Sequence, residues 1–335
     1  MAFFKQIFKR SVQIILPLLL GGLILWWVYK DFEFSKVGYV LSDVMDWKWM
    51  ILSLFFGVLG HVIRGVRWKL TLEPIGEHPK TSHCIYAVFF SYAANLVIPR
   101  IGEVSRCGVL HKYDGTSFSK SLGTVVSERL IDTLCVLLIT GFTLLAQRDV
   151  LLSFFDQTGT KVPDVRSLLL SGDFYIILIC LLAILVLLYF LIRHLSIFSK
   201  VKSVLKNIWE GILSLKKVQH LWLFVVYTIG IWLCYFLEFY IAAFCFPFSE
   251  HLSIMAALLL FVVGSIAVVV PTPNGAGPWH FAIITMMVLL GIGKEDAGIF
   301  ALIVHGIQTF LLILLGIYAM VALSLKNTNL KNNTL

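Results

Sequence analysis

The chain has 335 residues, of which 59% are hydrophobic, and its mean hydropathy of +0.90 excludes an ordinary soluble domain. Its formal net charge is +8, but the cations lie in loops between apolar segments rather than in a compact basic domain, which argues against nucleic acid as a partner. A membrane barrel would show alternating segments of about ten residues, and none occur. The composition therefore predicts an all-α integral membrane protein that crosses the bilayer several times.

Six apolar segments are each long enough to cross a bilayer as a helix, which takes about 20 residues. They are residues 12–29, 49–66, 121–146, 174–192, 221–246 and 297–323. Two further apolar stretches, 82–98 and 252–291, are interrupted by proline, glycine and polar residues. The basic residues before the first segment resemble those of a signal peptide. Because no small-residue cleavage site follows, we expect this segment to remain as the first helix.

The distribution of lysine and arginine predicts the topology, because short cationic loops stay in the cytoplasm. The N-terminus and the 193–220 loop are the most cationic regions. Both can be cytoplasmic only if 82–117 is a re-entrant hairpin rather than a full span. The same reasoning makes 252–291 a hairpin entered from outside. The prediction is one transmembrane domain over 1–325 and a polar tail over 326–335, with both termini cytoplasmic.

Two broken hairpins of opposite sidedness are typical of transporters with an inverted repeat, which bind substrate near the bilayer midplane. An amphipathic helix is predicted on the cytoplasmic surface near 196–218, where apolar residues alternate with lysines. The six cysteines form no CxxC pair and no Cys/His cluster. We therefore expect no metal and no cofactor.

A basic stripe ends the second predicted span, with His61, Arg64 and Arg67 at i, i+3 and i+6. One explanation is that these side chains extend to the lipid headgroups as anchors. The other is that they belong to a polar site. Three further polar side chains interrupt apolar helices and either enter the same cavity or bond between helices. They are Glu238, His305 and Gln308.

The first interrupted stretch contains a predicted helix break followed by charges on one face. Pro99 removes a backbone donor and disfavours helix at the residue before it, and Gly102 permits a tight reversal. Arg100, Glu103 and Arg106 then follow at i, i+3 and i+6. Because arginine binds phosphate through two parallel hydrogen bonds, this face is a candidate phosphate site. An ordinary hydrated loop is the alternative.

A second group of charges opens the third span, at Glu128, Arg129 and Asp132. Helical spacing places Glu128 and Asp132 on one face, with Arg129 within reach of Asp132. A charge near the middle of a membrane helix costs about 2.5–3.5 kcal/mol on insertion scales, so these residues must pair or face a wet cavity. The two interpretations are a structural ion pair at the helix end and a polar site within the bilayer.

The second interrupted stretch is a predicted unwound turn that ends at the start of a helix. Its turn residues are Pro271, Pro273, Gly275 and Gly277. Pro278 suits the first position of the following helix, whose free amides would favour an anion. Asn274 and His280 are the candidate binding residues at this turn, although it would also serve as a simple connection.

These three motifs, in this order and spacing, resemble the lysylphosphatidylglycerol synthase transmembrane family, a flippase-like domain of bacterial membrane proteins. The resemblance covers nearly the whole chain and implies a protein that handles or translocates lipids. It implies that the lipid headgroup is bound by Asn95, Arg100, Glu103, Arg106, Glu128, Arg129 and Asp132. Family members often carry glutamate where this chain has His280. The soluble lysyl-transferring domain is missing, so we expect no lysylphosphatidylglycerol synthesis.

The leading hypothesis is a flippase or transporter of the bacterial inner membrane whose partners are lipids with an anionic headgroup. Its arginines would hold the phosphate, and its carboxylates would orient them or meet a cationic group. Two alternatives remain open. One is an integral-membrane transferase acting on polyprenyl-phosphate or phospholipid, although no nucleophile arrangement is apparent. The other is a non-transporting membrane partner of a separately encoded lipid-modifying enzyme.

Overall fold

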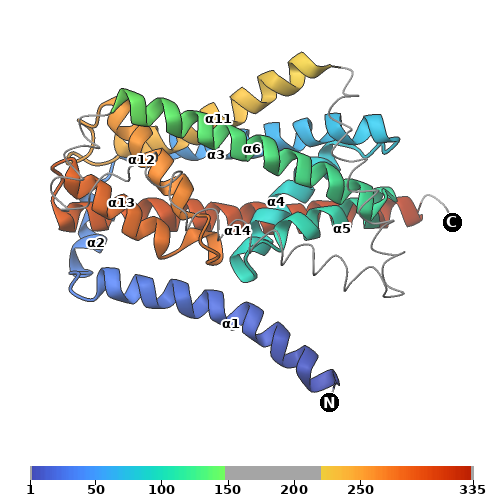
Figure 1. Ribbon diagram of the computed structural model, residues 1–335, viewed down its shortest axis with the longest axis horizontal. Coiled ribbons are helices and arrows are strands. Elements are labelled where there is room, and N and C mark those ends of the chain that lie inside the picture. The colour runs from blue at the N-terminus through green and yellow to red at the C-terminus, as the bar shows by residue number, and fades with distance from the viewer. Residues whose placement is uncertain (1, 148–219, 333–335) are drawn as a thin grey trace, which may run out of the picture.

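The described part of the chain folds into helices joined by short turns. The computed structural model describes residues 2–147 and 220–332, and it contains no strand within these ranges. The long helices run roughly side by side along the longest axis of the molecule (Figure 1). This arrangement confirms the predicted all-α class. The predicted span at 174–192 and the predicted surface helix at 196–218 lie outside the described residues.

Within residues 2–147 and 220–332, four helices are long and apolar enough to cross a membrane, and they coincide with four of the six predicted spans. They are α3 (Trp47–Leu72), α6 (Phe118–Ala146), α11 (Leu221–Ala243) and the Lys294–Leu325 part of α14 (Lys294–Asn332). The first predicted span falls within α1 (Ala2–Tyr29), whose side chains are described from Ile15 onward. Short helical turns connect α1 to α3 and α3 to α4: α2 (Ser35–Tyr39), η1 (Val40–Val44) and η2 (Glu73–Ile75).

The first interrupted stretch forms α4 (Thr81–Val97) and α5 (Gly102–Asp114), which pack against each other. The helix ends as predicted, because Ile98 is extended before Pro99. The left-handed residue of the reversal is Arg100, with φ of 65°, and not Gly102, which corrects the predicted role of this glycine. Gly102 is required for close approach instead, since a β-carbon there would collide with the carbonyl oxygen of Ser91.

The second interrupted stretch forms α12 (Ile254–Ala267) and α13 (Pro278–Leu289), with the short turn η4 (Pro273–Gly275) between them. Pro278 occupies the start of α13, as predicted. Gly277 has φ of 93°, and a β-carbon there would lie 2.8 Å from the carbonyl oxygen of Gly21. The glycine therefore allows the turn to pack against α1, which lies along one side of the bundle (Figure 1).

The two interrupted stretches meet at their breaks. α4 contacts η4, and Arg100 Nη2 donates a hydrogen bond of 2.8 Å to the Val269 carbonyl, just after the end of α12. The breaks therefore lie side by side, as expected for two halves around one site. Their insertion into a membrane from opposite sides, and the inverted repeat, stay predictions.

Small residues on α3 allow close packing with α11. A β-carbon at Gly60 would lie 2.8 Å from the Tyr235 ring, and one at Gly57 would collide with the Glu238 carboxylate. Such glycines let helices approach closely where hydrophobic burial gives no driving force. As a result, Tyr235 and Glu238 of α11 lie next to the basic stripe of α3. One hydrophobic cluster contains Met50 near the start of α3, and another contains Trp68 near its end.

Candidate functional site

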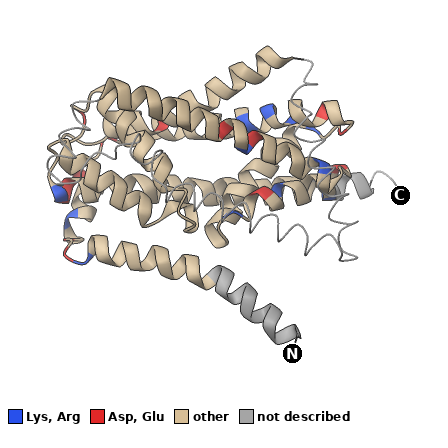
Figure 2. Ribbon diagram, viewed as in Figure 1, with Lys and Arg blue, Asp and Glu red and all other residues tan. Residues whose placement is uncertain are grey.

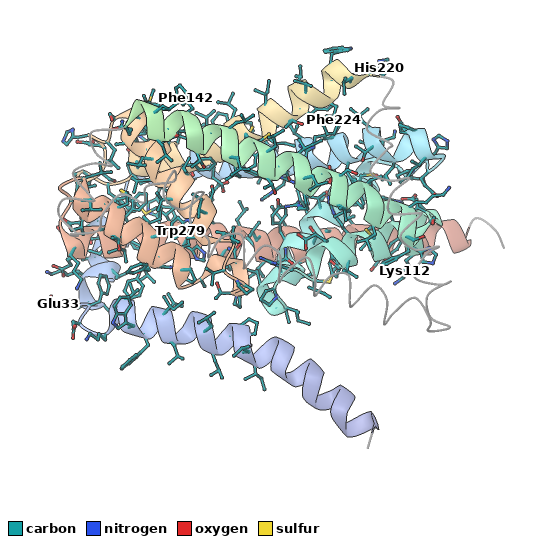
Figure 3. All side chains as sticks on the ribbon, in the orientation of Figure 1. Glu33, Lys112, Phe142, His220, Phe224 and Trp279 are labelled. Carbon is teal, nitrogen blue, oxygen red and sulfur yellow. The ribbon has the colours of Figure 1, made fainter. Side chains whose placement is uncertain are left out.

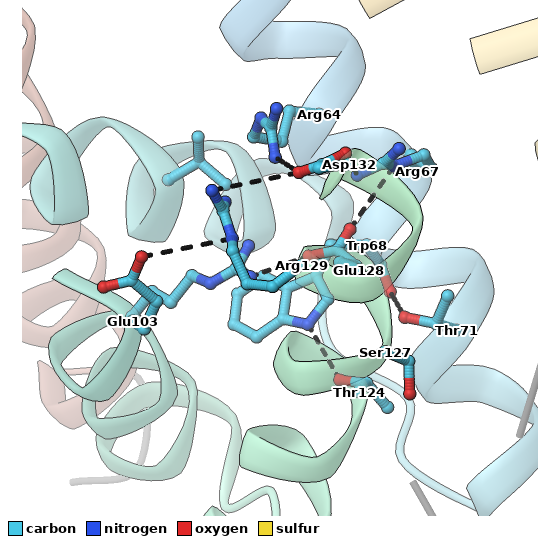
Figure 4. Close-up of polar contacts among 12 residues, drawn as sticks. Arg64, Arg67, Trp68, Thr71, Glu103, Thr124, Ser127, Glu128, Arg129 and Asp132 are labelled. Carbon is cyan, nitrogen blue, oxygen red and sulfur yellow. Dashed lines mark hydrogen bonds and ion pairs between the residues drawn. The ribbon is translucent and has the colours of Figure 1, made fainter. Parts of the chain in front are cut away.

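Buried charges join α3 to α6 within the bundle (Figures 2 and 4). Asp132 accepts hydrogen bonds from Arg64 Nη1 at 2.6 Å and from Arg67 Nη2 at 3.0 Å. Arg67 Nε also lies 3.4 Å from Glu128 Oε1. The side chains of these residues are at most 9% exposed, which shows that Arg64 and Arg67 are not headgroup anchors. Charges this well buried persist because each has an opposite partner.

Arg106 of α5 completes the buried part of this network. Its Nη2 lies 2.7 Å from Glu128 Oε2, and its guanidinium stacks over the Trp68 ring at 4.5 Å from the centroid. Trp68 Nε1 in turn donates to Thr124 Oγ1 at 3.0 Å. Arg106 and Glu128 are both fully enclosed, so this pair fits the structural ion-pair interpretation of the motif in α6.

Arg129 differs from the other arginines of the cluster because its charge is incompletely paired. Its Nη1 lies 3.8 Å from Asp132 Oδ2 and its Nε lies 4.0 Å from Glu103 Oε1, both longer than a hydrogen bond. Its side chain is 43% exposed. The cluster holds four arginines and three carboxylates, a formal excess of one positive charge: Arg64, Arg67, Arg106 and Arg129 with Glu103, Glu128 and Asp132. The excess charge is therefore assigned to Arg129.

Arg129 opens into a pocket of about 420 Å³ between α3, α4, α6, α11, α12 and α14. This volume lies within the range of about 300–1,000 Å³ typical of small-molecule sites. One wall carries the polar groups Arg64, Arg129 and Asp132, and much of the remainder is apolar and aromatic. Other polar residues of the lining are His61, Tyr92, Thr133, Tyr235, Glu238, Ser265, Asn274 and Gln308.

The hydroxyl of Tyr235 connects several side chains of the pocket wall. It lies 3.1 Å from His61 Nδ1, 3.1 Å from Arg64 Nε and 3.0 Å from the Tyr92 hydroxyl. These contacts and the ion pair with Asp132 leave Arg64 with little rotational freedom. The wall next to Arg129 is therefore organised before any ligand arrives, which lowers the entropic cost of binding.

Three of the predicted site residues line this pocket: Arg129, Asp132 and Asn274. Arg106 and Glu128 lie behind its wall. Asn95 Oδ1 accepts a hydrogen bond of 2.7 Å from the Gly102 backbone nitrogen, so its contact fixes the break between α4 and α5. Arg100 bonds to the second break, and Glu103 lies beside Arg129 outside the lining.

The turn before α13 is fixed by contacts with α14. Asn274 Nδ2 donates to Thr309 Oγ1 at 2.9 Å, and His305 Nε2 lies 3.0 Å from the Asn274 carbonyl oxygen. His280 lies outside the pocket lining. Its Nδ1 accepts a bond of 3.4 Å from the Gly277 backbone nitrogen, and its ring packs at 4.5 Å from that of His305. The contacts of His280 thus hold the turn.

Several pocket residues had weak signals in the sequence. The stripe of His61 and Arg64 was visible from its spacing, and Glu238 was visible as a charge in an apolar helix. The hydroxyls of Tyr92 and Tyr235 had no such signal, because tyrosine is common in apolar helices without a bonding role. Only the contact between α3, α4 and α11 identifies them.

Comparison with known families gives one match that covers most of the chain. Residues 14–316 match the family described as the lysylphosphatidylglycerol synthase TM region. This range contains the charged cluster, both interrupted stretches and the whole pocket lining.

A curated relative matches over a shorter range. A 136-residue stretch is 28% identical to the glycosyltransferase AglD of Haloferax volcanii, which is 40% of this chain and 22% of that protein. The match thus spans about a fifth of the relative's length. The similarity therefore covers only part of this chain and only part of the relative.

Proposed function

Since the chain belongs to the lysylphosphatidylglycerol synthase TM region family, we propose that it translocates membrane lipids with an anionic headgroup and binds that headgroup in the pocket beside Arg129. The protein is an integral membrane protein with helices long enough to cross a bilayer. The pocket offers a polar surface between those helices. A charged headgroup needs such a surface to pass through the hydrocarbon region.

The observation that carries the proposal is the incompletely paired guanidinium of Arg129. The nearby arginines already bond to carboxylates, whereas Arg129 lines the pocket and its nearest carboxylate oxygens lie 3.8 and 4.0 Å away. An arginine in this state binds a phosphate through charge-assisted hydrogen bonds. Arg64 and Asp132 would then orient Arg129 and the phosphate rather than supply additional free charge.

The meeting of the two broken stretches supports a transport role. Backbone without helical bonds is tolerated at membrane depth where protein or water satisfies it. Here the Arg100 side chain satisfies the Val269 carbonyl across the two breaks, and Asn274 lies both at the second break and on the pocket wall. Movement of the α4–α5 pair against the α12–α13 pair would open the pocket to alternate sides of the membrane.

Reconstitution tests this proposal with Arg129→Gln. We expect purified protein in vesicles to move phosphatidylglycerol carrying a fluorescent acyl chain, measured by loss of fluorescence to an external quencher. A charge-assisted hydrogen bond contributes about 1.5–3 kcal/mol, so the variant should bind soluble dihexanoyl phosphatidylglycerol roughly tenfold or more weakly and translocate correspondingly less.

The control is Lys112→Gln, which removes an exposed cation at the end of α5 outside the pocket. It should bind and translocate like the unmodified protein. Equal behaviour of Arg129→Gln and Lys112→Gln would contradict the proposed site.

The partial similarity to a glycosyltransferase supports a second candidate, a membrane transferase acting on polyprenyl-phosphate or phospholipid. Mass spectrometry of the vesicle lipids after incubation with nucleotide sugars separates the two. A lipid of altered mass would favour the transferase, whereas movement of unaltered lipid favours the transporter. Co-purification of a soluble enzyme without lipid movement would favour a non-transporting partner.

The proposed location is the bacterial inner membrane with both termini in the cytoplasm. The N-terminal end of α1 and the C-terminal end of α14 point toward the same end of the molecule in Figure 1, which supports a common side. Reporter fusions at each terminus test it, and reporters active on opposite sides would contradict it.

A further inference from the structure

An apolar groove lies on the surface formed by α6, α11 and α12, beside the polar pocket. Its volume is about 470 Å³. Its lining is mostly apolar and aromatic and includes Leu138, Phe142, Thr228, Ile229, Trp232 and Phe261. Leu138 and Ile229 are exposed, and Phe142 projects from the outer side of α6 (Figure 3). The groove thus presents a hydrocarbon surface to the surroundings of the bundle.

Of the polar groups that line the groove, the Thr228 hydroxyl is already occupied, whereas Trp232 Nε1 is buried without a hydrogen-bond partner among the described residues. The Thr228 hydroxyl donates to the Phe224 carbonyl at 2.7 Å and accepts from Arg67 Nη1 at 3.0 Å. It therefore has no remaining need for a polar ligand. The chemistry of the groove suits a saturated or unsaturated hydrocarbon chain.

The groove adjoins the polar pocket across a shared wall. Trp232 and Phe261 line both, and a smaller gap between the two is lined by Val136, Ile139 and Ser265 together with the same aromatic pair. The rings of Trp232 and Phe261 lie edge to face with centroids 6.3 Å apart. This gap has no room for a water molecule, so a molecule with a charged head beside Arg129 and an apolar tail would reach the groove around the Trp232–Phe261 pair rather than between the two rings.

We propose that the groove binds a long hydrocarbon chain of the same lipid whose phosphate lies beside Arg129, so that the ligand is recognised by head and chain together. This inference rests on the proposed function. Lipid tails are as apolar as leucine, so a chain gains no hydrophobic energy by leaving the bilayer for the groove. Its contribution is packing, which holds the headgroup at the depth of the pocket.

Photolabelling tests the groove directly in vesicles of phosphatidylcholine. The probes are phosphatidylglycerol and phosphatidylcholine that carry the same photoreactive group on the acyl chain. We expect the phosphatidylglycerol probe to label α6 and α11 residues of the groove more than the phosphatidylcholine probe does. Arg129→Gln should abolish this difference, because the head no longer anchors the chain.

Two adjacent residues on α6 provide a matched pair of variants. Leu138 is 65% exposed and lines the groove, whereas Leu137 is 63% exposed and does not. Leu138→Trp should fill the groove and reduce labelling by the phosphatidylglycerol probe to the level of phosphatidylcholine. Leu137→Trp should leave it unchanged. Binding of dihexanoyl phosphatidylglycerol, whose chains are too short to fill the groove, should be unaffected in both.

Three outcomes would overturn the inference: equal labelling by both probes, equal effects of both leucine variants, or no groove labelling because protein covers the groove. If dihexanoyl phosphatidylglycerol still binds in an Arg129-dependent manner, the proposed function survives and only the groove fails. Enriched labelling that persists in Arg129→Gln would instead contradict the headgroup site and retain the groove.

Discussion

Asp132 and Glu238 face the same pocket in opposite electrostatic surroundings. Asp132 lies within 4 Å of three guanidinium groups, from Arg64, Arg67 and Arg129. The Glu238 carboxylate makes no ion pair or hydrogen bond with the described residues and lies against Gly57 of α3, although the Glu238 backbone carbonyl accepts a bond of 2.6 Å from Ser53 Oγ. A buried ion pair is costly to break, whereas an isolated charge at membrane depth is costly to keep. The two carboxylates therefore have opposite effects on stability.

This difference predicts opposite effects of two neutral substitutions. Asp132→Asn leaves the arginines without their main partner and should destabilise the protein by about 3 kcal/mol. Glu238→Gln removes an unpaired acid of nearly the same shape and should leave the thermal midpoint unchanged or raise it. Thermal unfolding of the purified protein in detergent measures both. A lower midpoint for Glu238→Gln than for Asp132→Asn would contradict the assignment.

At the scale of elements, the break between α4 and α5 combines three local requirements. Pro99 ends α4, Arg100 adopts the left-handed conformation, and Asn95 bonds to the first residue of α5. A non-glycine residue with positive φ costs about 1–3 kcal/mol and persists where the surrounding structure enforces it. The hydrogen bond from Arg100 to Val269 accompanies this strained conformation, and it connects this break to the other one.

Two glycines on α5 give a prediction at this scale. Gly102→Ala would place a β-carbon against the Ser91 carbonyl oxygen and the Asn95 amide, so it should destabilise the protein and loosen the break. A β-carbon at Gly108, on the same helix, would meet no described residue within 4 Å, so Gly108→Ala should stabilise α5 by about 0.5–1 kcal/mol. Thermal midpoints of the two variants should move in opposite directions. Movement in the same direction would show that α5 packs differently.

At the scale of the whole molecule, the important contact is the one between the two interrupted stretches, the helix pair α4 and α5 and the helix pair α12 and α13. α4 and α5 contact α3, α6 and α14, whereas α13 contacts α1 and α14, and the Arg100 bond spans the junction. Such a junction would transmit movement of one pair to the other. It lies outside the pocket lining, so under the proposed function it would affect transport without contacting the ligand.

Arg100→Gln tests this relation by separating binding from movement. The variant should bind dihexanoyl phosphatidylglycerol as the unmodified protein does, because Arg129 and its partners are untouched. It should translocate lipid more slowly in vesicles, because the two pairs lose a direct contact. Equal losses in binding and translocation would instead place Arg100 in the headgroup site.

Features that depend only on residues close together in the sequence were predictable from the sequence alone. The four long apolar helices, the helix end before Pro99 and the helix start at Pro278 follow from hydropathy and from the missing proline donor. The family was also recognisable, because its three motifs are contiguous or closely spaced. These properties are local, and they hold wherever the segments lie in space.

The tertiary structure alone decided which charges are paired and which is available. Asp132 bonds to Arg64 across 68 positions of the chain, and Tyr235 bonds to Arg64 across 171. From the sequence alone, Arg100, Arg106 and Arg129 are equivalent candidates for the phosphate. Ion pairing acts over a few ångströms, so only the packing of α3, α5, α6 and α11 could place Arg106 behind the wall and leave Arg129 open to the pocket.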